Sequence, residues 1–285
     1  MYKIKKGCIV TRKSYKNDIL FSIEEINNTS KGKIANLKGI TVRIKADAPV
    51  EDLNIKDKVE VKNELEDIDK KIDNQVKESR IFLERYINIL CGKILHLDGD
   101  RRYAEKSAKY YKKIGLNAVV KNIPESRQPI MVGSLIRKYN PDILIITGHD
   151  GMIKNGTGYT DIYNYRNSRY FINTVREARM ASQGKDLVIF AGACQSFFEA
   201  IMESGANFAS SPARVLIDFM DPLIIAEKVA VTPEEKSITM SEMSNLLNDN
   251  NKRIGGRTTR GKKKKYTSTN TTLPAMWRWR KPQHT

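Results

Sequence analysis

The sequence has only three cysteines and three histidines among its 285 residues, and no acidic residue after position 250. The cysteines, Cys8, Cys91 and Cys194, are odd in number and widely spaced, which argues against a disulfide framework and a zinc knuckle. We expect no metal and no other cofactor. The sequence also lacks an apolar leader and any apolar run of membrane-spanning length. We therefore expect a cytoplasmic protein that does not contact a membrane.

The positive charge is concentrated near the carboxyl end. The formal net charge is +17, and residues 251–285 contribute eleven of these charges; subtracting them leaves +6 for the first 250 residues. A segment with charges of one sign and few large apolar side chains cannot bury a core, so we expect residues 251–285 to form a basic, disordered tail. Contact with nucleic acid would be made only through this tail, whose "PAMWRWRKPQ" interleaves aromatic and basic residues.

Residues 1–60 favour a small β module. They hold four segments rich in β-branched residues with turn residues between them, which predicts an SH3-like barrel: "GCIVTRKS", "ILFSIEEI", "GKIANL" and "ITVRIKA". Residues 61–90 then predict a linker helix, because apolar residues recur at helical spacing along one stripe: Val61, Leu65, Ile68, Ile72 and Val76. The stripe would pack on the body of the protein or on a second copy of the helix.

Residues 91–250 alternate between apolar strands and amphipathic helices. The five expected strands lie in "GKILHLDGD", "LNAVVKNI", "DILIITGHDG", "DLVIFAGAC" and "ANFASSP". Strands that are apolar along their length and linked by helices predict an α/β domain, a parallel sheet with helices on both faces. The functional sites of such sheets lie at the carboxyl ends of the strands.

Two reactive side chains follow consecutive strands at this edge. His149 lies after the third strand within Gly148-His149-Asp150-Gly151, and Cys194 lies after the fourth, next to Ala193. A thiol needs a base to become a good nucleophile near neutral pH, and an imidazole can supply both a base and a proton donor. A free cysteine is often only a small buried apolar residue, but its place beside a strand-end histidine favours a nucleophile.

These motifs resemble the caspase-like cysteine peptidases, in which the histidine follows the third strand and the cysteine the fourth. More closely, "TRKSYKNDILFSI", "KILHLDGD", "PDILIITGHD", "LVIFAGACQSFFE" and "GANFASSPARV" resemble the YabG family of sporulation-specific peptidases, over residues 1 to about 256. His149 is followed by Asp150 where the wider group usually has glycine. The resemblance implies that the N–H of Cys194 and one N–H of the Gly148–Gly151 loop stabilise the oxyanion. Because of Asp150, the sequence does not decide which residue of this loop supplies the second N–H.

The resemblance implies a cysteine endopeptidase, with Cys194 as nucleophile and His149 as acid and base. It implies protein substrates of the spore coat and cortex, and a location in the mother-cell cytoplasm with the spore coat as a second site. It also implies that the loop after the first strand lines the specificity pocket. Because Asp98 and Asp100 lie there, we expect cleavage after Arg, although "DGD" could equally be a polar turn that caps the next helix.

The sequence suggests three other interpretations. A nucleic-acid-binding protein with a barrel and a basic tail is the main alternative. A glutamine-amidotransferase-like hydrolase usually has its histidine after the cysteine, and here only His284 follows. A metal hydrolase could use His96, Asp98, Asp100 and His149, but it would leave Cys194 without a role.

Overall fold

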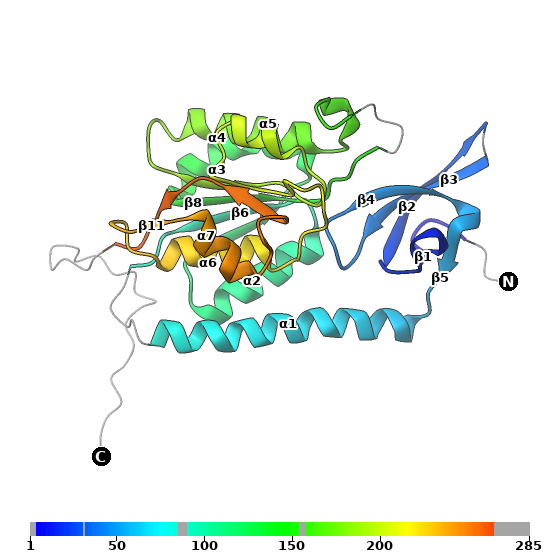
Figure 1. Ribbon diagram of the computed structural model, residues 1–285, viewed down its shortest axis with the longest axis horizontal. Coiled ribbons are helices and arrows are strands. Elements are labelled where there is room, and N and C mark those ends of the chain that lie inside the picture. Colours follow the sequence, from blue (N-terminus) through cyan, green and yellow to red (C-terminus); the bar gives the residue numbers. More distant parts are fainter. Residues whose placement is uncertain (1–3, 31, 85–89, 154–157, 265–285) are drawn as a thin grey trace, which may run out of the picture.

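The protein consists of an N-terminal β-sheet and an α/β domain, and a long helix runs along both (Figure 1). The structure, a computed structural model, describes residues 4–30, 32–84, 90–153 and 158–264. Mixed α/β architecture with a largely parallel sheet is as the sequence predicts.

The N-terminal sheet is antiparallel and open. Its strands pair in the order β4-β3-β2-β1-β5. The strands are β1 (Ile9–Arg12), β2 (Phe21–Thr29), β3 (Gly32–Gly39), β4 (Lys45–Pro49) and β5 (Leu53–Ile55), with 3-10 turns at Lys13–Tyr15 and Val50–Asp52. Because β4 and β5 are the two edges and do not pair with each other, the expected SH3-like barrel is not confirmed.

One expected strand of this module is displaced. The sequence predicts a strand over "ITVRIKA", residues 40–46, but pairing with β3 begins only at Lys45. Residues 40–44 instead leave the N-terminal sheet and run toward the α/β domain, where Ile44 forms an isolated parallel bridge with Asp150. This connection between β3 and β4 brings the N-terminal module to the carboxyl edge of the larger sheet.

Helix α1 (Lys58–Glu84) uses its apolar stripe as core. Val61, Ile72 and Val76 are buried, and Ile68 packs against the apolar cluster to which both the N-terminal sheet and the α/β domain contribute. The helix lies beside α2 (Arg101–Ile114), where Lys106 pairs with Asp69 at 2.6 Å. The stripe is thus used within the chain.

The α/β domain has a six-stranded sheet in the order β12-β10-β9-β8-β6-β7. Every neighbouring pair is parallel except β10 and β12, which are antiparallel. The strands are β6 (Ile94–Asp98), β7 (Ala118–Asn122), β8 (Ile143–Thr147), β9 (Val188–Ala191), β10 (Phe208–Ser210) and β12 (Ile254–Gly256).

Helices cover both faces of the sheet, because side chains alternate along each buried strand (Figure 1). Ile143 and Ile145 of β8 face one apolar cluster, whereas Leu144 and Ile146 face the other. The first cluster includes α2 and α6 (Asp221–Val231); the second includes α3 (Gln128–Tyr139), α4 (Ser168–Ala181) and α5 (Phe198–Glu203). Short 3-10 turns occupy Glu125–Arg127 and Ile162–Asn164.

The boundary of the expected tail lies further along the chain than residue 251. Strand β12 completes the main sheet, and β13 (Thr259–Arg260) pairs with β11 (Ser237–Ile238), next to α7 (Met240–Leu247). Lys262, one of the basic residues assigned to the tail, forms an ion pair with Asp186 at 2.6 Å. Main-chain pairing at the free edge of β10 therefore orders this basic segment. Residues 265–285 lie outside the described residues.

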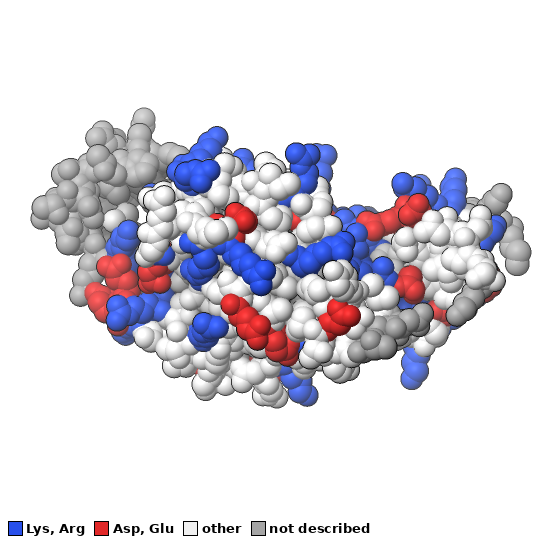
Figure 2. All heavy atoms as spheres, turned by 90° about the horizontal axis from the view of Figure 1, so that it is seen from above, with Lys and Arg blue, Asp and Glu red and all other residues white. Residues whose placement is uncertain are grey.

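The surface above the sheet carries basic and acidic side chains interspersed with uncharged ones (Figure 2). Within the described part of the chain, no helix combines the length and the apolar character needed to cross a membrane.

Candidate active site

The parallel order of β9, β8 and β6 brings three strand-end segments together. Asp98 at the end of β6 is in register with Thr147 at the end of β8, and Ile146 of β8 is in register with Ala191 of β9. The segments that follow these strands hold Asp100, His149 and Cys194. The residues that the sequence singled out therefore lie at one edge of the sheet, as the strand-end rule requires.

Cys194 lies in the turn between β9 and α5. Ala193 is fixed from two sides, because its N–H donates to Ser196 Oγ at 2.9 Å and its carbonyl accepts from Ser210 Oγ at 2.8 Å. The thiol is fully buried, and its Sγ accepts the N–H of Ile217 at 3.3 Å. Burial raises the pKa of the Cys194 thiol to about 12, so this enclosed thiol is neutral at physiological pH.

His149 is also fully buried, and its two ring nitrogens differ. Nε2 lies 3.0 Å from the carbonyl oxygen of Gly39, which can only accept a hydrogen bond, so Nε2 carries the proton. Nδ1 then carries the lone pair, and among the described residues it has no hydrogen-bond partner. The ring stacks on Tyr103 with centroids 5.6 Å apart, and burial lowers the pKa of His149 to about 3. The site thus holds an unpaired imidazole base.

Asp150 fixes the turns after β8 and β9 relative to each other. Its buried carboxylate accepts from the N–H of Gly151 and of Asn167, and from the hydroxyls of Ser168 and Ser196. It therefore connects the turn after β8 with the turn after β9 and with the start of α4. Burial raises the pKa of Asp150 to about 6. The four hydrogen bonds give a physical reason for an aspartate at this position of the turn.

The other residues of the turn after β8 permit close approach. The carboxylate of Glu125 lies over Gly148, where a Cβ would come within 2.4 Å of it, and accepts the N–H of His149 at 2.7 Å. At Gly151 a Cβ would lie 2.1 Å from the carbonyl oxygen of Lys45. Glycine at both positions therefore lets Glu125 and the β3–β4 connection reach the backbone beside His149.

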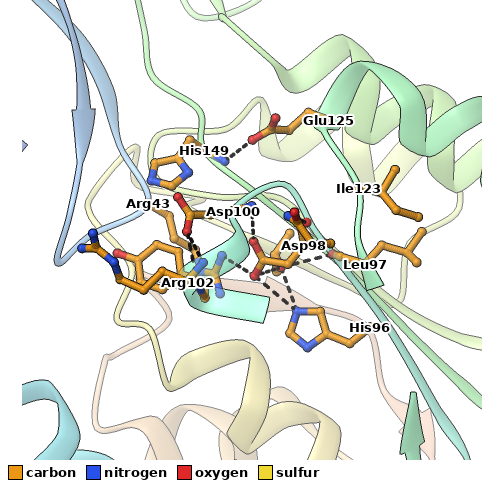
Figure 3. A network of polar contacts seen from close by, with 12 residues as sticks. Arg43, His96, Leu97, Asp98, Asp100, Arg102, Ile123, Glu125 and His149 are labelled. Carbon is orange, nitrogen blue, oxygen red and sulfur yellow. Dashed lines mark hydrogen bonds and ion pairs between the residues drawn. The ribbon is translucent and has the colours of Figure 1, made fainter. Parts of the chain in front are cut away.

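No motif in the sequence marks Arg43, yet it lies among Asp98, Asp100 and His149 (Figure 3). The N–H of Cys194 and the N–H of Asp150 both donate to its carbonyl oxygen, at 3.3 and 3.2 Å. Two amides that converge on one oxygen form the arrangement that stabilises an oxyanion in acyl transfer. One of the two N–H groups belongs to Asp150, which lies within the Gly148–Gly151 loop.

The side chain of Arg43 enters a fully buried pocket. Its Nη1 donates to Asp98 Oδ2 at 2.8 Å, and neither side chain is exposed to solvent. The guanidinium carbon lies 4.4 Å from the centre of the Tyr103 ring and 5.6 Å from that of Phe219. Its Nε and Nη2 have no hydrogen-bond partner. The pocket thus combines one carboxylate with two aromatic rings, a combination that suits a cation.

Asp100 has a different environment from Asp98. Its side chain accepts the N–H of Arg102 and of Tyr103 and so caps the start of α2. It also pairs with Lys38 of the N-terminal module at 2.6 Å, and these contacts lower its pKa to about 2 although its burial opposes this shift. In this structure Asp98 binds a guanidinium, whereas Asp100 is engaged by a helix end and a lysine.

His96 lies on the other side of Asp98 and has partners on both nitrogens. Nε2 lies 2.8 Å from Thr147 Oγ1, and Nδ1 lies 3.2 Å from the hydroxyl of Tyr111. The Thr147 hydroxyl in turn lies 3.0 Å from Asp98 Oδ2, so these contacts help to orient the pocket carboxylate. Burial lowers the pKa of His96 well below its usual value, which keeps the ring neutral.

Cys194 and His149 contact the same segment rather than each other. No hydrogen bond joins their side chains in the described structure; the Cys194 N–H bonds to Arg43, and His149 bonds to Gly39. Among the described residues, no three His, Cys, Asp or Glu side chains are grouped as metal ligands would be.

A peptide segment laid across a thiol, an unpaired imidazole nitrogen and two converging amides defines the class of protein as a hydrolase of peptide bonds. Comparison with known proteins agrees. The chain matches the family model of YabG peptidase U57 over residues 5–268. It is 40% identical over 275 residues to the sporulation-specific protease YabG of Bacillus subtilis (strain 168), which covers 90% of this chain and 94% of that protein.

The chain therefore belongs to the YabG peptidase family U57, and it is a sporulation protease. No solved structure matches it. Membership of a peptidase family also disfavours the alternative of a nucleic-acid-binding protein with an inert α/β body.

Proposed function

We propose that the chain is a cysteine endopeptidase with a caspase-like fold, in which Cys194 is the nucleophile and His149 the general acid and base. The observation that carries this assignment is the convergence of two N–H groups, from Cys194 and Asp150, on one peptide carbonyl oxygen. The positions of His149 after the third strand and Cys194 after the fourth strand of the domain agree with it.

The chemistry follows from the atoms present. Cys194 Sγ attacks the carbonyl carbon of the scissile bond, and His149 Nδ1, the ring nitrogen without a partner, takes up the thiol proton and delivers it to the leaving amine. The N–H groups of Cys194 and Asp150 stabilise the oxyanion. Water then attacks the thioester, activated by the same nitrogen. Gly39 supports this tautomer, because its carbonyl holds the proton on Nε2.

We further propose that the enzyme cleaves after Arg and that Asp98 selects this residue. Its carboxylate already binds a guanidinium at 2.8 Å in a pocket without exposed atoms, and Tyr103 packs on that cation. Lys would be a poorer substrate because an ammonium lacks the planar shape that lies on an aromatic ring. Asp100 contributes less to the selection of Arg, because its carboxylate caps α2 and pairs with Lys38.

The proposed substrates are proteins of the spore coat and the cortex, and the proposed place of action is the mother cell and the forming coat. The support is the sporulation role of the family together with the absence, in the described residues, of a helix able to span a membrane. Incubating spore-coat extract with the wild type and with Cys194→Ala, and mapping new termini, tests this. New termini after Arg in coat proteins, seen only with the wild type, are the expected result.

A peptide library varied at the residue before the scissile bond tests specificity. We expect wild-type kcat/KM to be highest for Arg, about tenfold lower for Lys, and near background for Asp and Asn. Asp98→Asn should lower the value for Arg by about 100-fold, because it removes one partner of a buried charge pair. Asp100→Asn is the matched control and should retain the Arg preference. An Arg preference that survives Asp98→Asn would place the pocket elsewhere.

A further inference from the structure

The connection between β3 and β4 crosses the site in the manner of a bound substrate. We propose that Arg43–Ile44 is an internal cleavage site: the chain is made with this segment in its own active site and becomes an open enzyme when Cys194 cuts the bond. This inference rests on the proposed function, since it needs Cys194 to be the nucleophile, and it adds a covalent self-processing step at a named bond.

Arg43 occupies the place of the residue before a scissile bond. Its carbonyl oxygen accepts the two N–H groups of Cys194 and Asp150, at 3.3 and 3.2 Å, and its side chain fills the pocket of Asp98. Both contacts are those that a cleaved residue needs, because one polarises the carbonyl and the other selects the side chain. A segment that only connected two modules would have no need to bury a charged side chain completely.

The residues after Arg43 are bound on the other side of the bond. Ile44 pairs with Asp150 in a parallel bridge, and the N–H of Lys45 donates to the carbonyl of Asp150 at 2.6 Å. Gly151 leaves room for the Lys45 carbonyl. On the preceding side, Ile40 is held by the hydroxyl of Tyr103, which donates to its carbonyl at 2.9 Å. The backbone is thus fixed on both sides of the Arg43–Ile44 bond.

The same segment closes the site to other peptides. With Arg43 in place, Cys194, His149 and Asp98 are all fully buried, and the oxyanion donors are engaged. The guanidinium is held by one charge-assisted hydrogen bond, while its Nε and Nη2 have no partner. This single contact holds Arg43 less tightly than a bidentate pair would, which suits an occupant that leaves after cleavage.

The step is an ordinary peptide hydrolysis within one chain. Cys194 Sγ forms a bond to the carbonyl carbon of Arg43, and the bond from that carbon to the nitrogen of Ile44 breaks. The thiol proton passes through His149 Nδ1 to the nitrogen of Ile44, which becomes a free amine. Water then hydrolyses the thioester, restores the thiol and leaves Arg43 with a terminal carboxylate.

The cut chain would keep its architecture. The strands on both sides of the bond remain in the N-terminal sheet, because β3 and β4 pair with each other. Their pairing runs from Lys38 opposite Lys45 to Ile34 opposite Pro49. Gly39 stays in β3 and continues to hold the proton on His149 Nε2. Only residues 40–43 become a free end, which can swing out of the pocket and open the site to other substrates.

The test follows the full-length purified chain by intact mass and N-terminal sequencing. We expect the wild type to convert into fragments 1–43 and 44–285, the second beginning at Ile44, and Cys194→Ala to stay intact. Because Arg43 is fully buried, the cut should be made within one molecule. Its rate constant should therefore not change over a 100-fold range of protein concentration, and intact Cys194→Ala should resist added processed wild type.

Variants at Arg43 need a matched control, which Arg12 supplies. Arg12 is also buried in the N-terminal module, pairs with Asp52 at 3.1 Å and lies over the ring of Tyr15, but it takes no part in the active site. Arg43→Lys should slow the cut about tenfold and Arg43→Ala at least about 100-fold. Arg12→Lys should leave the rate within about twofold of the wild type, with thermal unfolding as the check of folding.

A synthetic peptide, "GITVRIKAD" (residues 39–47), keeps the proposal testable if the Arg43 variants do not fold. Processed wild type should cut it between Arg and Ile. If the enzyme hydrolyses external Arg peptides through Cys194 while its own chain stays intact or is cut elsewhere, self-processing at Arg43 is overturned and the proposed function stands. If Cys194→Ala processes itself like the wild type, both the inference and the proposed function are overturned.

Discussion

Strand β6 contains one histidine and the turn after β8 contains another, and the two have opposite surroundings. His96, in β6, has a partner on each ring nitrogen, from Thr147 and Tyr111. His149, after β8, has one partner, Gly39, and its Nδ1 is buried without any. Both rings are inaccessible to solvent and both have a lowered pKa because of burial. Burial therefore does not distinguish them, whereas hydrogen-bond satisfaction does.

The difference separates a positioning residue from a residue able to do chemistry. A buried polar atom without a partner costs free energy, so a fold keeps one where another need outweighs that cost. Nδ1 of His149 is such an atom, beside the oxyanion donors, and we assign it the proton transfers. His96 instead contacts Thr147, which contacts Asp98, and so it helps to hold the carboxylate of the specificity pocket.

The largest expected effect is on turnover when His149 is removed. His149→Ala should lower kcat/KM for an Arg peptide by about 10³-fold, because both proton transfers lose their carrier. The matched change His96→Gln should keep kcat/KM within about tenfold. Steady-state kinetics on the two variants and the wild type give the comparison. Equal losses of kcat/KM in both variants would contradict the assignment of different roles to His149 and His96.

For the stability of the fold we expect the opposite order: replacing His96 should cost more than replacing His149. His96→Phe leaves Thr147 and Tyr111 without their shared partner and should lower the free energy of unfolding by about 2 kcal/mol. His149→Phe loses only the bond to Gly39 and should cost about 1 kcal/mol. Urea unfolding in the Cys194→Ala background keeps the chain intact. A larger cost at His149 would contradict the assignment of His96 as the structural residue.

The free energy of unfolding should depend on pH in the same direction through His149 and through His96. The pKa of His149 is lowered to about 3 in the folded chain from 6.5, so the unfolded state takes up the proton first as the pH falls. The stability contributed by the neutral ring is present above pH 6.5 and is lost as the pH falls toward about 3.

The measurement compares Cys194→Ala with Cys194→Ala/His149→Gln, so that the contributions of ionisable groups that do not interact with His149 cancel. The unfolding free energy of Cys194→Ala minus that of the double variant should fall by about 1.4 kcal/mol for each pH unit well inside this range, and it should change sign. His96→Gln in the same background should show the same trend. A difference independent of pH would mean that the His149 ring is solvated in the intact chain.

The smallest effect is expected at Asp100, the carboxylate that follows β6 and does not contact Arg43 in this structure. Asp100→Ala removes a helix cap and an ion pair and should cost about 1 kcal/mol of stability. The preference for Arg over Lys should not change, whereas Asp98→Asn should weaken it. Thermal unfolding and the peptide library measure the two effects. A lost Arg preference in Asp100→Ala would assign the pocket to both carboxylates.

Much of the α/β domain can be predicted from the sequence, because its strands are buried on both faces and therefore apolar throughout. Strands β6, β8 and β9 are of this kind, and the strand-end rule then places His149 and Cys194 at one edge. The rule does not distinguish Asp98 from Asp100. That distinction depends on which carboxylate lies within the buried strand and which begins a helix.

Arg43 could not be found from the sequence, and the reason is physical. "ITVRIKA" alternates apolar and polar residues as a strand does, and nothing local marks its departure from the sheet. Its role depends on partners far along the chain, with Asp98 55 residues away. The short strands β12 and β13 escape prediction for a related reason: they contain three and two residues, and their pairing depends on the exposed edges of β10 and β11.

The most direct test of the account is turnover of an Arg peptide by Cys194→Ala, with Cys91→Ala as the matched control. Cys91 is also a free, largely buried cysteine, but it lies before β6, away from the strand-end site. We expect kcat/KM to fall to background in Cys194→Ala and to stay within about twofold of the wild type in Cys91→Ala. Turnover retained in Cys194→Ala would contradict the assignment of Cys194 as the nucleophile.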